Sequence, residues 1–239
     1  MTQQADYHKL DPKLIVETVR KLQTRVEERF PERGLAKVAA ELTLLAQEAG
    51  PRAQRIARGN VVRRMAGMLI AALLVLGLLL YGLQTVHDDG VTDLASFLQT
   101  LEAGIASLVF LGAAIVSLVT FDARRARTRI LRALDEIRSM AHVVDMHQLA
   151  KSPEKLVLRG APTPSSPDME SDPFLMGRYL DYCSEMLSLM SKIAAVYVRD
   201  SDDPVALSAA DEIESLTGGL SMKLWQKILL LSQMPRGAA

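Results

Sequence analysis

The stretch RRMAGMLIAALLVLGLLLYGL, residues 63–83, decides the fold, because it forms either a helix buried in a soluble core or a helix that crosses a membrane. From Met65 to Leu83 it carries no charged side chain, and about 20 apolar residues of helix cross a bilayer core. A helix of a soluble domain normally keeps a polar face, which this stretch lacks. A second uncharged run, AGIASLVFLGAAIVSLVTF at residues 103–121, has the same length. We therefore predict two transmembrane helices, at about 65–83 and 103–121.

The charges around the two runs are distributed unequally. The connection 84–102 contains Asp88, Asp89, Asp93 and Glu102 but no Lys or Arg, so the positive-inside rule places both termini in the cytoplasm. Because residues 1–62 are largely polar and precede the first run, it is not a cleaved signal peptide. The flanking arginines are also expected to attract anionic headgroups. They are Arg52, Arg55, Arg58, Arg63 and Arg64 before the first run, and Arg124, Arg125, Arg127, Arg129 and Arg132 after the second.

The composition indicates an all-α protein. Apolar residues make up 49% of the 239 residues but aromatic residues only 5%, and no segment shows the alternating pattern of a strand. A net charge of zero gives no general attraction for nucleic acid, so none is expected as a partner. The single Cys183 excludes an intramolecular disulfide and paired-cysteine zinc or redox motifs. We predict no cofactor.

Three Asp-Pro pairs predict where cytoplasmic helices begin, because Asp caps a helix and Pro suits its first position. The pairs are Asp11-Pro12, Asp172-Pro173 and Asp203-Pro204. Apolar residues at three- and four-residue steps predict a helical hairpin in residues 1–60, and a second hairpin is predicted in residues 173–239. In the first hairpin these residues are Ile15, Val19, Leu22, Val26 and Phe30, followed by Leu35, Val38, Leu42, Leu45 and Ala49. Gly218-Gly219 predicts a kink or a break in the last helix.

Residues 123–158 are predicted to continue the second transmembrane helix into the cytoplasm. They carry a short heptad seam, formed by Ile130, Leu134, Ile137, Ala141 and Val144. A Pro- and Ser-rich linker follows at 159–172. The predicted architecture is therefore a transmembrane helical hairpin, residues 61–122 with a short acidic external loop, that anchors a cytoplasmic helical bundle.

The polar side of the juxtamembrane helix carries the nearest approach to a reactive cluster. Asp135, Arg138, His142 and Asp145 are spaced to project from one side, opposite the seam. His142 and Asp145 could bind a metal or act as a proton switch, but a solvated or salt-bridged face explains the pattern better. His147 lies five residues from His142, too far around the helix to share one ion with it.

The remaining candidates do not form a recognisable active site. Phosphate-binding glycine loops, HExxH and GxSxG are absent from the sequence, and neither Ser184 nor Cys183 has an identifiable base at a useful spacing. We therefore predict no enzyme activity and no catalytic, cofactor-binding or metal-binding residue. Cys183 is expected to be a small core residue. Trp225, between Lys223 and Lys227, is expected in the bundle core, with a place at the membrane interface as the alternative.

Small residues in the two runs permit close helix contacts. Gly67 with Ala71, and Ala113 with Ser117, are spaced for helix packing or oligomerisation. Ser107, Ser117 and Thr120 could line a pore between subunits, although serines are also common in helix interfaces. Neither run carries an ionisable residue in its interior, which disfavours a proton relay or a transporter.

Segments 141–156 (AHVVDMHQLAKSPEKL), 179–197 (YLDYCSEMLSLMSKIAAVY) and 28–42 (ERFPERGLAKVAAEL) resemble stretches of an uncharacterised bacterial family of two-span membrane proteins. The resemblance supplies no activity, but it implies the bacterial inner membrane. The sequence thus predicts a non-enzymatic interaction, scaffolding or signalling module in the lipid bilayer. It would self-associate, or bind a protein partner, through its juxtamembrane and transmembrane helices. The alternative is an oligomeric membrane-perturbing effector or small channel that the cytoplasmic bundle gates.

Overall fold

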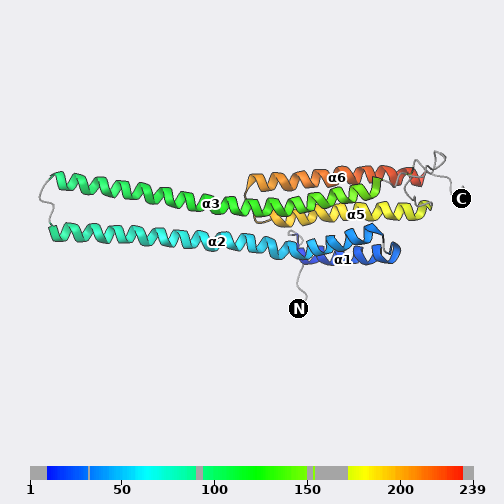
Figure 1. The fold of residues 1–239 in the computed structure, drawn as a ribbon, viewed down its shortest axis with the longest axis horizontal. Coiled ribbons are helices and arrows are strands. Elements are labelled where there is room, and N and C mark those ends of the chain that lie inside the picture. Colours follow the sequence, from blue (N-terminus) through cyan, green and yellow to red (C-terminus); the bar gives the residue numbers. More distant parts are fainter. Residues whose placement is uncertain (1–9, 32, 90–93, 150–152, 154–171, 234–239) are drawn as a thin grey trace. The chain divides into compact units, whose positions relative to one another are not determined.

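The computed structural model describes residues 10–31, 33–89, 94–149, 153 and 172–233 (Figure 1). These residues form helices joined by short turns, and no strand occurs among them, so the all-α prediction is confirmed. The helices are α1 Pro12–Arg29, α2 Gly34–Asp89, α3 Leu94–Leu149, α5 Pro173–Val198 and α6 Pro204–Ser232. The predicted linker, apart from Asp172 at its end, lies outside the described residues.

The chain divides into two compact units. The bundle unit combines Met1–Gln54 with Ile130–Ala239, and the apolar unit is Arg55–Arg129. Helices α2 and α3 each contribute residues to both units. The residues on both sides of the two apolar runs thus fold together, as expected for hairpins that cannot bury their apolar faces alone.

All three Asp-Pro pairs begin helices as predicted. The side chains of Asp11, Asp172 and Asp203 each accept a hydrogen bond from a backbone N–H in the first turn, and the proline after each one occupies the start of its helix. Helix α1 ends where the backbone N–H of Phe30 donates to the carbonyl of Val26 at 2.8 Å, directly before Pro31. These ends are set by local chemistry.

Helix α5 carries much of the bundle core. It packs against both α6 and α1. Its fully buried side chains include Met176, Leu180, Met186 and Met190. The five apolar residues predicted along α1, from Ile15 to Phe30, are also buried. The periodicity of α1 therefore identified its core face correctly.

Helix α3 joins the bundle through its C-terminal part. Residues 123–149 of the predicted continuation beyond the second apolar run belong to α3, which is helical from Leu94 to Leu149. An ion pair of 2.7 Å joins Arg138 of α3 to Glu212 of α6. Another of 2.7 Å joins Arg52 of α2 to Glu136 of α3.

Two turn signals in the sequence do not interrupt a helix. Helix α6 continues through Gly218 and Gly219, so the predicted break is wrong. Helix α2 likewise continues through Pro51 and includes both the second half of the N-terminal hairpin and the first predicted span. The connection predicted at 84–102 is mostly helical, because α2 extends to Asp89 and α3 begins at Leu94.

Candidate functional site

The surface of the apolar unit is the most unusual feature of the described chain. Helix α3 contains an 18-residue window with a mean hydropathy of 2.3, and none of that window is buried. Phe110 is 76% exposed and Val116 is 66% exposed. By length and composition, this one described helix is suited to cross a membrane. Within the first predicted span, the described apolar segment Gly67–Gly77 is shorter than a full span.

The two units differ in how many of their apolar side chains are buried. Among the described side chains of the apolar unit, only Ala71 and Ala126 are buried hydrophobic residues. The core helix of a soluble domain would bury most of its large side chains, whereas large side chains here lie on the surface. An exposed apolar surface of this kind marks a site that contacts lipid or another protein.

Helices α2 and α3 of the apolar unit approach each other at a glycine. A Cβ atom added at Gly67 would lie 2.7 Å from Cδ2 of Leu118, too close for an unadjusted contact. Ala71, one turn further along, is 8% exposed. The first predicted small pair therefore lies where α2 meets α3 within one chain. The second pair, Ala113 with Ser117, is exposed.

Two hydroxyl groups in the apolar stretch of α3 bond to their own helix. Ser107 donates to the carbonyl of Ala103 at 2.8 Å, and Thr120 donates to that of Val116 at 2.7 Å. Such bonds satisfy a hydroxyl in an apolar environment without a water-filled channel. Two of the three candidate pore-lining side chains, Ser107 and Thr120, therefore have hydrogen-bond partners within their own helix, as a lipid environment permits.

The heptad seam of α3 is occupied within the chain. Its five members, Ile130, Leu134, Ile137, Ala141 and Val144, are each at most 4% exposed in the bundle unit. Helices of the same chain cover them, so these side chains are not available to a second subunit. The expectation that the seam carries subunit contacts is corrected accordingly, because periodicity identifies a buried face but not the helix that covers it.

The predicted polar cluster of α3 separates into ordinary surface contacts. Arg138 pairs with Glu212, and Asp145 accepts a hydrogen bond of 2.6 Å from the side-chain amide of Gln148. Asp135 and His142 are exposed. Within the described residues, no group of three His, Cys, Asp or Glu side chains could hold a metal ion. This arrangement matches the salt-bridged face that we considered as the alternative.

A contact that the sequence did not predict closes the C-terminal end of α3. The Lys227 ammonium of α6 donates to the carbonyl of Gln148 at 3.1 Å and also to its side-chain oxygen. A cation at a helix C-terminus satisfies carbonyls that have no partner within the helix and opposes the negative end of the helix dipole. Lys227 thus links α6 to α3.

His147 near the same helix end lies against Gly34 at the start of α2. A Cβ atom at position 34 would overlap the imidazole ring. The carbonyl of His147 also accepts a hydrogen bond of 3.4 Å from the Tyr179 hydroxyl. His147 is therefore a packing residue that brings α2, α3 and α5 together, and it does not pair with His142.

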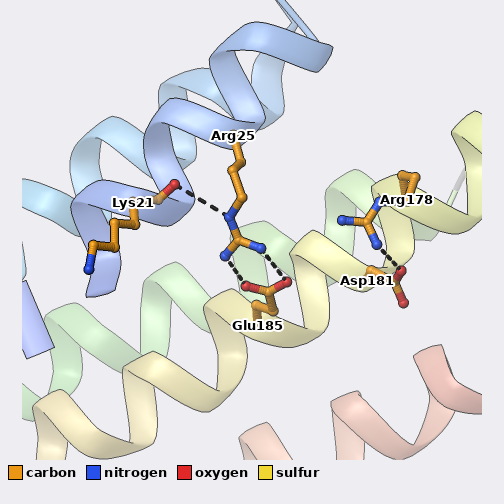
Figure 2. A network of polar contacts seen from close by, with 5 residues as sticks. All are labelled: Lys21, Arg25, Arg178, Asp181 and Glu185. Atoms are coloured by element: carbon orange, nitrogen blue, oxygen red, sulfur yellow. Dashed lines mark hydrogen bonds and ion pairs between the residues drawn. The ribbon is translucent and has the colours of Figure 1, made fainter. Parts of the chain in front are cut away.

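Arginines and aromatic rings join α1 to α5 in a second unpredicted cluster, and Figure 2 shows its polar contacts. The guanidinium group of Arg25 forms a two-pronged bond with Glu185, one prong measuring 3.2 Å, and its Nε donates to the carbonyl of Lys21. Arg178 pairs with Asp181 at 3.0 Å. Both guanidinium groups also lie over the ring of Tyr182, at 5.7 and 5.0 Å from its centre.

The Tyr182 ring therefore has two guanidinium groups near its π-system, and such contacts are attractive. Phe30 meets Tyr182 and Tyr179 edge to face, at 6.2 and 5.5 Å between ring centres. These contacts hold α1 on α5. Because each arginine already has a carboxylate partner, we interpret the cluster as structural.

Arg52 holds a comparable position between α2, α3 and α5. Its hydrogen bond to Glu136 holds the pKa of that carboxyl below its usual range, and its guanidinium lies 6.0 Å from the centre of the Tyr197 ring. The Tyr197 hydroxyl is buried, and no hydrogen-bond partner is found for it among the described residues. Its burial raises the pKa of this phenol.

The two nucleophile candidates lie next to each other on α5. Cys183 is fully buried, as predicted for a core residue. Burial raises the pKa of its thiol to about 12, so the reactive thiolate is scarce at neutral pH. Ser184 is half-buried on the same helix. Neither position has the electropositive, accessible surroundings of an activated nucleophile.

Trp225 does not lie in the bundle core. Its side chain is 61% exposed on α6, so the prediction of a core tryptophan is wrong. Leu224, the preceding residue, occupies the buried position. A shift of one residue changes the direction of a helical side chain by about 100°, and the apolar run around Trp225 left that choice open.

Scans of known protein families and searches of curated proteins and solved structures find no match to this chain.

Proposed function

We propose that this chain is a non-enzymatic interaction module anchored in the inner membrane of a bacterium. Helices α2 and α3 cross the bilayer as a hairpin, at about 65–83 and 103–121, and the bundle unit lies in the cytoplasm. The observation that carries the proposal is the apolar window of α3, of which no part is buried. The bundle unit supplies the interaction surface, for a protein partner or a second copy of the chain.

The composition of α3 supports insertion quantitatively. Residues 103–121 contain ten Leu, Ile, Val and Phe residues, each contributing roughly 0.3 to 0.6 kcal/mol to insertion, or about 3 to 6 kcal/mol together. The exposed hydroxyl group of Thr120 bonds to its own helix, which reduces the cost of placing it in lipid.

The flanking charges support the orientation. Arg58, Arg124, Arg125 and Arg129 are exposed at the ends of the apolar stretches, whereas the connection between the stretches contains only acidic charges. Arginines at one side of two adjacent spans retain that side in the cytoplasm. Both termini are therefore assigned to the cytoplasm.

Self-association through the spans requires a helix face that is not already used in the contact between α2 and α3. Gly67 and Ala71 are used where α2 meets α3, and the seam of α3 lies inside the bundle. The exposed pair Ala113 and Ser117 remains, and small residues at this spacing allow two helices to approach closely in lipid. We assign subunit contacts to this face of α3.

The channel alternative has less support than the anchor. A pore between subunits needs polar groups directed to water, and the hydroxyls of Ser107 and Thr120 bond to their own helix. Ion flux through liposomes that contain the purified protein, compared with a Gly112→Leu variant, tests it directly. Flux that the variant abolishes would favour the channel over the anchor.

Labelling of single cysteines in intact cells tests the proposed anchor and its orientation. Cysteines are placed at Gln3, Asp89 and Ala238 in a Cys183→Ser background, and each variant is treated with a thiol reagent that does not cross the membrane. We expect labelling of Asp89→Cys alone, with all three variants labelled after the cells are opened. Labelling of both termini in intact cells would indicate the opposite orientation, with both termini outside the cytoplasm. Recovery of the protein in the soluble fraction without detergent would refute the anchor itself.

A further inference from the structure

A dense group of arginines follows the apolar stretch of α3 directly. Residues 121–132, FDARRARTRILR, contain five arginines and a single acidic residue, Asp122. The side chains of Arg124, Arg125 and Arg129 are exposed. This group of positive charges begins where the exposed apolar surface ends.

The conformation of Arg125 directs its charge towards that boundary. Its guanidinium carbon lies 4.5 Å from the centre of the Phe121 ring, which belongs to the preceding helical turn. Helical side chains lean towards the helix N-terminus, which in α3 is the direction of the apolar stretch. Phe121 is itself 54% exposed. The ring thus supports the planar cation at the last apolar residue.

The dimensions of a bilayer place these arginines at the level of the lipid phosphates. The headgroup layer adds about 5 to 8 Å on each side of the hydrocarbon core, and a helix rises about 1.5 Å per residue. If the hydrocarbon ends near Phe121, then Arg124 and Arg125 lie within the headgroup layer. Arg129 lies one turn beyond and can lean back towards it. This step rests on the proposed membrane insertion.

We propose that Arg124, Arg125 and Arg129 bind the phosphate groups of anionic phospholipids in the cytoplasmic leaflet. A guanidinium group can donate two parallel hydrogen bonds to two phosphate oxygens. The Phe121 ring holds the Arg125 group in place before the lipid arrives, which reduces the ordering required on binding. The site thereby fixes the depth of α3 and selects anionic lipid over zwitterionic lipid.

Quenching by brominated lipids tests the proposal on the full chain. The protein carries a fluorophore on Ala123→Cys and is reconstituted into phosphatidylcholine vesicles that contain phosphatidylglycerol, with either lipid brominated in turn. The quenching by brominated phosphatidylglycerol, divided by that from brominated phosphatidylcholine, gives the preference for phosphatidylglycerol at this site. We expect Arg125→Gln to reduce that preference about fivefold, the effect of one surface charge. The control Arg20→Gln removes the same charge from an exposed position in the bundle unit and should change nothing.

Three measurements separate the possible failures. Resistance of each sample to alkaline extraction reports insertion, so an extractable protein refutes the proposed anchor. An inserted protein with equal quenching by both lipids, or with equal effects of the two substitutions, refutes the lipid site alone. Loss of the preference on addition of inorganic phosphate at constant ionic strength would identify a site for soluble phosphate instead of lipid.

Discussion

Replacing Ile137 by alanine tests whether the seam of α3 is part of the chain's own core. Ile137 is 1% exposed, with buried Leu134 and Ala141 on the same face. An Ile→Ala substitution at such a site removes buried methyl groups and leaves a cavity, at a cost of about 2 to 5 kcal/mol. We take about 3 kcal/mol as the expected loss in the free energy of unfolding.

Thermal unfolding in detergent, followed by far-ultraviolet circular dichroism, measures this loss. For domains of about 150 to 250 residues, 1 kcal/mol corresponds to roughly 2 to 4 °C, so the Tm should fall by about 6 to 12 °C. Val143→Ala on the same helix is the control, because Val143 is 41% exposed. A surface substitution of this kind should change the free energy of unfolding by less than about 0.5 kcal/mol.

The dependence of Tm on protein concentration distinguishes a core seam from a subunit seam. If the seam lies inside one chain, its contribution to stability does not depend on concentration, whereas a contact between subunits becomes more stable as the protein is concentrated. The reasoning is refuted if Ile137→Ala leaves the Tm near that of the parent protein but lowers its oligomeric state.

Three further substitutions test local features of the structure. Asp203→Ala removes an acceptor for two backbone N–H groups at the start of α6, and it should cost about 1 kcal/mol by denaturant titration, whereas exposed Asp202→Ala should be neutral. Gly67→Leu should overpack the contact with Leu118 and lower the free energy of unfolding by about 1 to 3 kcal/mol in a detergent melt. Adding Leu118→Ala should restore part of this lost stability, and no restoration would argue against the contact. Burial raises the pKa of Cys183 from 9.0 to about 12, so the thiol favours the folded state fully below pH 9, and this contribution is lost as the pH rises towards 12. Denaturant titrations from pH 9 to 12 should show that the free energy of unfolding falls less for Cys183→Ala than for the parent protein. Equal losses would contradict the raised pKa of Cys183.

The features that the sequence predicted correctly depend on short-range chemistry. An Asp-Pro pair provides a cap and a suitable first residue within three positions, so Asp11, Asp172 and Asp203 could be identified without knowledge of the tertiary structure. The buried faces of α1 and α3 follow from periodicity in the same way. The uncharged composition of residues 103–121 was equally visible in the sequence.

The features that the sequence did not predict depend on the element that lies opposite. Periodicity identified the seam of α3 but not the helices of the same chain that cover it. Lys227 reaches Gln148, and Arg25 reaches Glu185, across separations along the chain that no local pattern encodes. The core prediction for Trp225 is wrong because Leu224 lies directly beside it, so hydrophobicity alone does not indicate which of the two faces inward.

The close contact between Gly34 and His147 has a consequence for the evolution of this chain. No side chain larger than hydrogen fits at position 34 while an imidazole ring occupies its space, so the two positions should change together in any relative. A relative with alanine at 34 should carry a smaller residue at 147. Gly218 and Gly219, which have open space around them, should vary independently of the rest of the bundle. An alignment of relatives would then reveal the contact between α2 and α3 as a pair of coupled columns, without any structure.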